Sequence, residues 1–354
     1  MTYRPVTADE SNPRAFEEYL AKRDNELGWP DPKIFGGDKY DEEGGRRNPD
    51  YPDVGRVAPC ISTFGDSFMA GEKVGLEHVW TVHLGRSLGC RVANFGVGGY
   101  GSDQAYLRYQ RMSKNAPNIV ILGHLSENIL RNSMRIRDLY STSREYGLKP
   151  RFIWGQDGDL ELVPLPDINA EEFERILGLA SPPLVLEHEY FNPGGLANPV
   201  LVTPPFTWSL LRSLGHFRLK ARLQGVPSYH AFYHPDHPAD GLRVTAGIFR
   251  NFARDVRQAG GQPLLLIFAG PGDVEFLQEN NESVYQSLVD IMDREGILYV
   301  DMAPVLLEYL GDRDPQELIV LGHYNEEGNK LVATAVEAFM RQNGLVDSLE
   351  SAPR

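Results

Sequence analysis

The stretch ISTFGDSFMAG, residues 61–71, ends an apolar run on a hydroxyl. Ile61 to Phe64 is typical of a buried strand, and Gly-Asp-Ser follows it directly. Ser67 therefore has two interpretations: it caps the next helix, as serine often does, or it is a nucleophile at the end of a strand. A nucleophilic serine needs a base within hydrogen-bond reach and donors for the oxyanion that forms on attack. The rest of the chain has to supply both.

Two later turns offer oxyanion donors. The run RVANFGVGG, residues 91–99, ends in glycines, and the second of the pair, Gly99, could present its backbone N–H. The run NIVILG, residues 118–123, is followed by HLSEN, in which Asn128 could present its side-chain amide. With the Ser67 N–H they would make three donors. Tight-turn geometry for the glycines and a solvated loop position for Asn128 are the alternatives.

A base is available near the end of the chain. LGHYNEEGNKLVATA, residues 321–335, places His323 in the loop before a final helix, with Asn325 near its N-cap. Taken alone, His323 could equally be a helix-capping or surface histidine. The joint occurrence of serine, glycine, asparagine and histidine in this order favours acyl transfer through a covalent acyl-enzyme.

Alternating strands and helices must position these residues. Five short apolar runs are separated by amphipathic segments, which indicates a parallel sheet covered on both faces. Right-handed crossovers then predict a three-layer, doubly wound α/β fold with ligands at the carboxyl ends of the strands. The expected strands fall at residues 61–64, 91–99, 118–123, 262–270 and 297–304.

Two regions depart from this rhythm. Residues 1–56 are rich in proline, glycine and charge, and we expect an N-terminal arm with one short helix before a domain that spans 57–354. Residues 138–241 interrupt the alternation, and we expect an insertion that forms a lid or wall. Within it, residues 150–166 predict a hairpin, and two helical patterns follow.

With these motifs, the chain resembles the SGNH (GDSL-type) hydrolase superfamily. The resemblance covers about residues 57–135 and 242–343 and implies a flavodoxin-like fold. It also implies that Ser67 is the nucleophile and His323 the base, with an oxyanion hole of the Ser67 and Gly99 N–H groups and the Asn128 amide. The implied activity is that of a serine esterase or acyltransferase acting on a small O-acyl ester, such as an acetyl group on a sugar or metabolite.

The sequence departs from the family pattern at two places. In strict register Glu127 takes the asparagine position of the third block; we favour Asn128 because a carboxylate would repel an oxyanion, and Asn132 is a further alternative. Val320 occupies the usual position of the acid that orients the histidine. Either a backbone carbonyl holds the imidazole or a nearby acid replaces the missing one; the nearby acids are Asp312, Asp314 and Glu317. A weakly active or inactive carbohydrate-binding protein is the alternative function.

Composition argues against other classes of protein. The formal net charge is −14, which is unsuited to nucleic acid, and no run approaches the length of a membrane-spanning helix. We expect a cytoplasmic protein without a cofactor, acting on a small-molecule or carbohydrate ester; the number of subunits is not set. Cys60 and Cys90 each open a predicted strand and could be neighbours, and we expect two buried thiols.

Two other clusters resemble binding motifs without matching them. In HAFYHPDHPAD, the side chains of His230, His234, Asp236 and His237 have the composition of a metal site, but the prolines prevent one helical face from presenting them. We expect a turn-rich loop that borders the cleft, and no metal. The glycines at 96–101 lack the spacing of a dinucleotide-binding loop.

Overall fold

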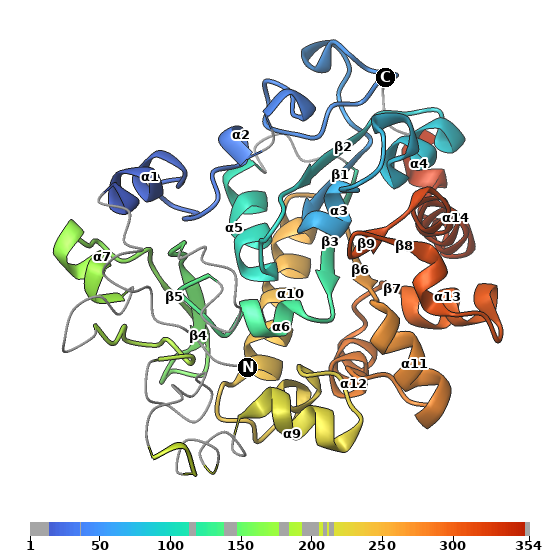
Figure 1. Cartoon of the computed structure of the whole chain (residues 1–354). Helices are drawn as coiled ribbons and strands as arrows, with labels where there is room; N and C mark the ends of the chain where they lie inside the picture. Colours follow the sequence, from blue (N-terminus) through green and yellow to red (C-terminus); the bar gives the residue numbers. More distant parts are fainter. Residues whose placement is uncertain are drawn as a thin grey trace.

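A five-stranded parallel sheet forms the centre of the chain (Figure 1). The computed structural model describes residues 14–35, 37–112, 118–137, 147–176, 184–192, 205–207, 211 and 216–350. The strand order is β2-β1-β3-β6-β7. This is the flavodoxin-like order, so the predicted fold class and all five strands are confirmed. The strands are β1 (Ile61–Gly65), β2 (Val92–Gly96), β3 (Ile119–Leu125), β6 (Gln262–Phe268) and β7 (Tyr299–Asp301).

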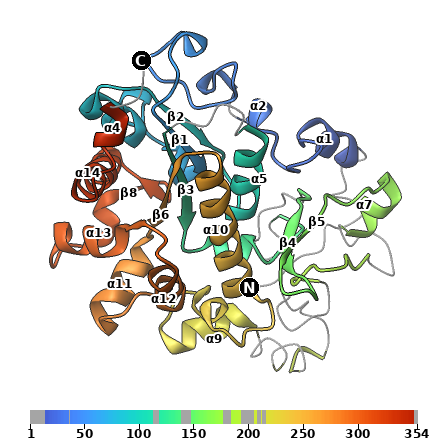
Figure 2. The same cartoon turned by 180° about the vertical axis from the view of Figure 1, so that it is seen from behind.

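Helices cover both faces of the sheet, as the nearly continuous apolar runs predict. Contacts place α5 and α10 on one face, where α10 crosses the sheet as seen in Figure 2. On the other face α4 packs against α14, and α13 and α14 cover β6 and β7. The helices of the domain are α3 (Ser67–Ala70), α4 (Trp80–Leu88), α5 (Ser102–Met112), α6 (Asn128–Arg131), α10 (Gly241–Gln258), α11 (Pro271–Asn280), α12 (Gln286–Glu295), α13 (Met302–Leu310), α14 (Glu326–Gln342) and α15 (Asp347–Glu350).

The last strand differs in detail from its prediction. The apolar run 297–304 forms only the short strand β7, because Asp301 caps the helix α13 by accepting a hydrogen bond from the Ala303 N–H (3.0 Å). Two helices, α11 and α12, join β6 to β7. The first of them ends before Asn281, which has a positive φ of 53°. Asparagine tolerates this left-handed conformation better than most residues, so the helix ends there.

The N-terminal arm packs along the edge strand β2. The Arg46 N–H donates to the Asn94 carbonyl (2.6 Å), and the Tyr40 hydroxyl donates to the Gly96 carbonyl (2.8 Å). These bonds satisfy part of an edge that would otherwise expose unpaired backbone groups. The arm contains the expected helix, α1 (Ala15–Ala21), and the short elements α2 (Pro32–Phe35), η2 (Gly37–Lys39) and η3 (Val54–Arg56).

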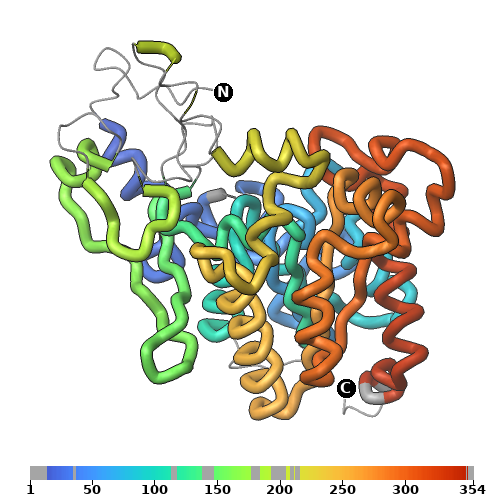
Figure 3. Tube along the Cα trace, turned by 90° about the horizontal axis from the view of Figure 1, so that it is seen from below, coloured from blue at the N-terminus to red at the C-terminus, as the bar shows by residue number. Residues whose placement is uncertain are grey.

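The insertion begins after β3 and α6. Its predicted hairpin is confirmed: β4 (Arg151–Trp154) and β5 (Leu160–Val163) pair in antiparallel fashion and stand out from one side of the molecule (Figure 3). The hairpin is anchored by Lys149, whose buried ammonium pairs with the buried Asp103 carboxylate on α5. The helices α7 (Ala170–Ile176) and α9 (Phe217–Gln224) confirm parts of the two helical patterns; residues 177–179, 208–210 and 212–215 of these patterns lie outside the described residues.

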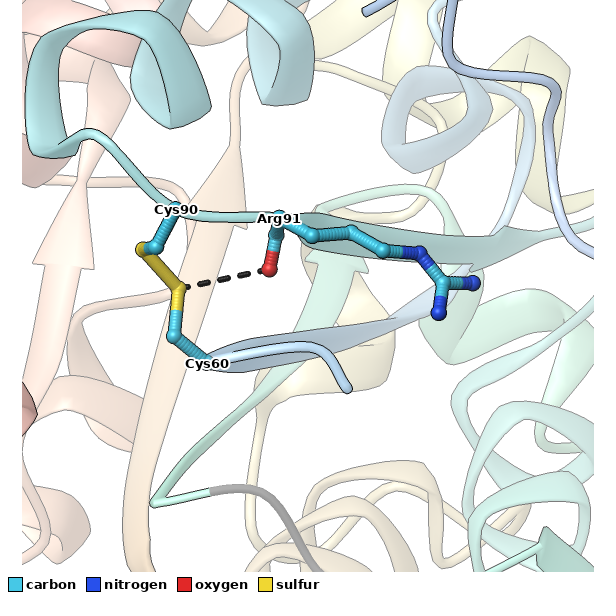
Figure 4. The surroundings of a disulfide bond; sticks show 3 residues. All are labelled: Cys60, Cys90 and Arg91. Carbon is cyan, nitrogen blue, oxygen red and sulfur yellow. Dashed lines mark hydrogen bonds between the residues drawn. A yellow bond between two sulfur atoms is a disulfide. The ribbon is translucent and has the colours of Figure 1, made fainter. Parts of the chain in front are cut away.

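The two cysteines form a disulfide, so the prediction of two buried thiols was wrong (Figure 4). The register pairs Ile61 with Val92, which brings the starts of β1 and β2 together. The Cα atoms of Cys60 and Cys90 are 6.1 Å apart, within the range that a disulfide spans. Both residues are half-buried rather than fully buried. The prediction weighed the burial habit of cysteine without knowing the strand register.

The cellular compartment stays a prediction. No helix in the described part of the chain is long and apolar enough to cross a membrane. The disulfide bears against the cytoplasmic assignment, because such bonds persist mainly in oxidising compartments.

Reduction of the disulfide should destabilise the fold. The bond closes a loop with a sequence separation of 30 residues, so chain entropy predicts a loss of about 3.6 kcal/mol in the free energy of unfolding. Urea titrations with and without reductant measure the loss. The double variant Cys60→Ala/Cys90→Ala is the control and should be insensitive to reductant. Two titratable thiols in the purified, unreduced protein would contradict the disulfide.

Candidate functional site

Ser67 lies at the first position of α3, directly beyond the carboxyl end of β1. Asp66, not Ser67, is the N-cap: its Oδ1 accepts hydrogen bonds from the Phe68 N–H (2.9 Å) and the Met69 N–H (3.4 Å). The capping interpretation of Ser67 was therefore wrong. Within the described part of the chain, neither the hydroxyl nor the N–H of Ser67 has a hydrogen-bond partner. Neither group is therefore used in a hydrogen bond of the fold, although the side chain itself is buried.

Close packing fixes the position of α3. Gly96 lies beneath it, and a Cβ at this position would be 2.4 Å from the Ala70 nitrogen and 2.8 Å from the Asp66 carbonyl oxygen. Only glycine allows the helix to approach β2 this closely. The Asn94 Nδ2 donates to the Met69 carbonyl (2.8 Å) and ties the end of α3 to the same strand. The motif NFG thus holds the helix that carries Ser67.

Gly99 faces a partly exposed region at the same edge of the sheet. Its φ of +85° is a conformation that glycine adopts without strain. A Cβ here would lie 3.2 Å from the Arg137 Nε and 3.5 Å from the Trp29 ring. Trp29 comes from the arm and Arg137 from the residues that lead directly into the insertion, so segments on both sides of the central domain reach the Gly99 turn. No local sequence pattern indicates either neighbour.

Asn128 is brought to Ser67 through Asp66. The Asn128 Nδ2 donates to the Asp66 Oδ2 (3.1 Å), and both side chains are buried. Because a carboxylate oxygen only accepts, this contact fixes the orientation of the amide, and Nδ2 keeps a second hydrogen. The Arg131 Nη1 lies 3.4 Å from the same oxygen and donates to the Tyr100 carbonyl (3.0 Å).

The alternatives to Asn128 lie elsewhere. Asn132 uses both ends of its amide within the fold: Oδ1 accepts from the Asp103 N–H (3.3 Å), and Nδ2 donates to the Thr245 hydroxyl (2.9 Å). Glu127 is half-exposed and occupies the N-cap position of α6. Of the three, only Asn128 contacts the residue that precedes Ser67.

His323 lies on a two-strand hairpin, β8 (Ile319–Val320) and β9 (His323–Tyr324), close to α3 (Figure 1). Its ring centroid is 5.2 Å from that of Phe68, the residue after Ser67. The hairpin is held over β6 by Tyr324, whose hydroxyl donates to the Ala269 carbonyl (2.7 Å). The nucleophile and the base predicted from opposite ends of the chain thus share one edge of the sheet, although they are not hydrogen-bonded to each other.

The His323 Nδ1 lies 3.2 Å from the carbonyl oxygen of Leu321. Leu321 and Gly322 form the turn of the hairpin with φ angles of +48° and +79°, as a two-residue hairpin turn of this kind requires. A leucine in this left-handed conformation costs about 1–2 kcal/mol. The strained turn places the Leu321 carbonyl beside the imidazole, and the preceding residue, Val320, stands at the sequence position where the SGNH pattern has an acid.

None of the three upstream acids has a recorded contact with His323 among the described residues. Asp314 caps η7 (Pro315–Leu318) through the Gln316 N–H (2.8 Å). Glu317 lies 3.5 Å from the Arg313 guanidinium, and Asp312 is exposed. Asn325 is the N-cap of α14, as predicted, and accepts from the Gly328 N–H (3.0 Å).

The histidine-rich loop holds no metal-like cluster. In the part of the chain that the structure describes, no group of three or more histidine, cysteine, aspartate or glutamate side chains is arranged to hold an ion. The His237 ring packs on Phe232 with centroids 4.1 Å apart, and the His230 ring packs on Phe276. Burial lowers the pKa of both imidazoles. They act as packing residues of the turn around η6 (His230–Tyr233).

No known family model matches the chain, and no curated protein matches its sequence. Solved structures are similar to it. A member of the lipolytic protein G-D-S-L family from Veillonella parvula is 12% identical, with a TM-score of 0.36, over 79% of this chain and 98% of that one. TesA is 13% identical with a TM-score of 0.40 over 80% and 98%, and the acetyl xylan esterase AlAXEase is 12% identical with a TM-score of 0.38 over 78% and 98%.

These names agree with the resemblance that the sequence motifs show. The likeness is one of fold, and at such low identity and superposition it carries no argument about activity or substrate. Those depend on the residues at the edge of the sheet.

Substitutions of Asn128 and Asn132 should differ in whether they mainly lower stability or mainly slow the reaction of Ser67. Asn132→Ala removes two buried hydrogen bonds and should lower the free energy of unfolding by about 2 kcal/mol, with little effect on the reactivity of Ser67. Asn128→Ala should have the smaller effect on stability and slow reaction with a serine-directed phosphonate about 100-fold, as loss of an oxyanion donor does. Urea unfolding and intact mass over time measure both. The reverse order would assign the third donor to Asn132.

Proposed function

We propose that the chain is a serine ester hydrolase of the SGNH type. The observation that carries this proposal is the cap of α3: Asp66 satisfies the helix N-terminus, so the Ser67 hydroxyl is left without a structural bond at the carboxyl edge of a parallel sheet. His323 stands beside it against Phe68. A structural serine at this position would be expected to cap the helix itself.

The reaction follows from these positions. The Ser67 Oγ attacks the ester carbonyl carbon while His323 Nε2 takes the hydroxyl proton. The oxyanion that forms accepts hydrogen bonds from the Ser67 N–H, the Gly99 N–H and the second Asn128 Nδ2 hydrogen. The imidazolium then gives its proton to the leaving alcohol, and an acyl-Ser67 ester is left. Water, deprotonated by His323, attacks this ester and releases the acid.

The carbonyl of Leu321 supports the role of His323 as the base. A carbonyl oxygen can only accept, so a hydrogen bond to it requires the proton on Nδ1. The lone pair is then on Nε2, which is the atom that has to accept the serine proton. This is the tautomer that an orienting acid selects in a triad. The pair Ser67–His323 would therefore work as a dyad.

The substrate we propose is a small O-acyl ester, such as an acetyl ester of a sugar or metabolite. This part of the proposal rests on the superfamily resemblance. Transfer to an acceptor alcohol differs from hydrolysis only in the nucleophile that resolves the acyl-enzyme, and the insertion would determine which nucleophile enters. Short nitrophenyl esters and acetylated sugars, with and without acceptor alcohols, separate these outcomes.

Labelling of Ser67 tests the chemistry before any substrate is known. A fluorophosphonate should add one phosphonyl group at Ser67 at neutral pH, identified by the intact mass and by peptide mapping. Ser67→Ala should abolish the adduct, because the nucleophile is lost. His323→Ala should slow it by at least 100-fold, because the base is lost. A folded wild-type protein that forms no adduct would refute the hydrolase and favour the carbohydrate-binding alternative.

Val320→Asp tests the dyad. Val320 pairs with His323 across the hairpin, and side chains of such pairs lie about 5 Å apart. An aspartate here could accept the Nδ1 proton and stabilise the imidazolium, so labelling should be about ten-fold faster. Val320→Asn, which has the same shape without the charge, is the control. It should raise the labelling rate by less than about three-fold, which is half of the ten-fold gain on a logarithmic scale. A slower Val320→Asp variant with unchanged stability would show that the site does not accommodate an orienting acid.

A further inference from the structure

A buried polar network lies beneath the loop that joins β3 to α6. At its centre is Asp273, a fully buried carboxyl group in the first turn of α11. Its Oδ2 accepts from the Ser126 hydroxyl (2.6 Å) and from the Gly270 N–H (2.7 Å), and its Oδ1 accepts from the Tyr229 hydroxyl (2.9 Å). The Gly270 bond is ordinary helix capping. The bonds from Ser126 and Tyr229 are additional and join three separate segments.

Tyr233 holds both the loop and the end of β3. The Tyr233 hydroxyl is 2.6 Å from the Ser126 carbonyl and 2.9 Å from the His124 Nε2, and the Ser102 hydroxyl is 2.7 Å from the His124 Nδ1. A carbonyl only accepts, so Tyr233 donates to Ser126 and receives the Nε2 proton of His124. Ser102 then donates to Nδ1. Burial lowers the pKa of His124 to about 3, consistent with this neutral form.

Among the described residues, the central carboxyl group of this network forms no ion pair with a cationic side chain. The groups that interact electrostatically with Asp273 include Tyr229 before η6, Tyr233 in η6, Tyr285 before α12, Asp301 at the end of β7 and Tyr324 on β9. Burial, reinforced by Asp301, raises the pKa of Asp273 to about 7. Burial of an acid that has no ion-pair partner costs free energy of folding. We therefore expect a role of Asp273 other than stabilising the fold.

The position of Asn128 suggests such a role for Asp273. The end of β3 is held at His124 and the loop at Ser126, and Asn128 follows Ser126 by two residues with its amide on Asp66. All three points of attachment lie within five residues. We propose that Ser126 and Asp273 are positioning residues that set the Asn128 amide for the oxyanion. This inference rests on the proposed function and extends it.

The charge of Asp273 should govern the strength of this attachment. An ionised carboxylate accepts all three donors, and hydrogen bonds to an ionised group are about twice as strong as neutral ones. A protonated Asp273 must give its own proton to a neighbour, so one of the three contacts reverses and the others weaken. The loop should therefore be held more firmly above pH 7 than below it.

The test compares Ser126→Ala with two matched variants. Ser126→Thr keeps the hydroxyl, and Ser133→Ala removes another buried hydroxyl, which lies just after α6 and donates to the Ile129 carbonyl (2.9 Å) of that helix. At pH 8.5, phosphonate labelling of Ser67 should be at least ten-fold slower in Ser126→Ala and within three-fold of wild type in both others. Backbone amides of residues 123–130 should exchange hydrogen at least ten-fold faster in Ser126→Ala alone.

The pH dependence separates positioning from a general structural role. The ratio of wild-type to Ser126→Ala labelling rates cancels every pH effect that both proteins share. This ratio should fall from at least ten at pH 8.5 to about three or less at pH 5.5, because protonation of Asp273 weakens the bond that only the wild type has. A ratio that is constant over this range would overturn the role of Asp273.

The two proposals fail separately. A wild-type protein without a Ser67 adduct refutes the hydrolase, and hydrogen exchange then still decides whether Ser126 and Asp273 hold the loop. Exchange in Ser126→Ala equal to that in wild type or in Ser133→Ala overturns the positioning role, whatever the labelling shows.

Discussion

The carboxylate of Asp66 is the constraint on which the rest of the site depends. One oxygen caps α3, and the other accepts the amide of Asn128. A single buried group thus performs the capping that would otherwise fall to Ser67 and sets the distance between two of the loops at the edge of the sheet. Removal of this carboxylate would leave α3 without its cap and Asn128 without its anchor. The Gly-Asp-Ser sequence at the end of β1 therefore reflects a division of labour: aspartate for structure and serine for chemistry.

The carboxyl edge of the sheet gathers groups from all parts of the chain. Parallel strands end on the same side, so Ser67, Gly99 and Asn128 lie at the same edge of the sheet although about sixty residues separate the first from the last. His323 arrives separately, on a hairpin that Tyr324 fastens to the end of β6. The disulfide joins β1 and β2 at the opposite, amino end of the same strands. The stabilising disulfide and the proposed reactive groups therefore lie at opposite ends of the same strands.

The sequence predicted the sheet well because each strand is buried on both faces and reads as one apolar run. It predicted that Ser67 and His323 lie at the carboxyl edge of the sheet, because in a doubly wound fold the residues that follow the strands gather at this edge. It failed where the outcome depends on register or on long-range packing. The pairing of Cys60 with Cys90 follows from the alignment of β1 with β2, and no local pattern encodes this alignment. The approach of Trp29 and Arg137 to Gly99 follows from how the arm and insertion dock.

Local backbone geometry decides two further questions that the sequence left open. An Asp-Ser pair before a helix leaves open which residue is the cap, and the choice of Asp66 became visible only through its bonds to Phe68 and Met69. The loss of the orienting acid at Val320 left two alternatives, and the φ of Leu321 bears on them, because it turns a carbonyl toward the imidazole. The polar network around Asp273 had no sequence signal, since its members come from four separate elements.

The most direct measurement is a crystal structure of the phosphonylated protein. The phosphonyl oxygen stands where the oxyanion of the tetrahedral intermediate would stand. The account predicts that it lies within about 3.2 Å of the Ser67 nitrogen, the Gly99 nitrogen and the Asn128 Nδ2, with His323 Nε2 facing the Ser67 Oγ. A phosphonyl oxygen that points to solvent, or an adduct on a residue other than Ser67, would contradict it.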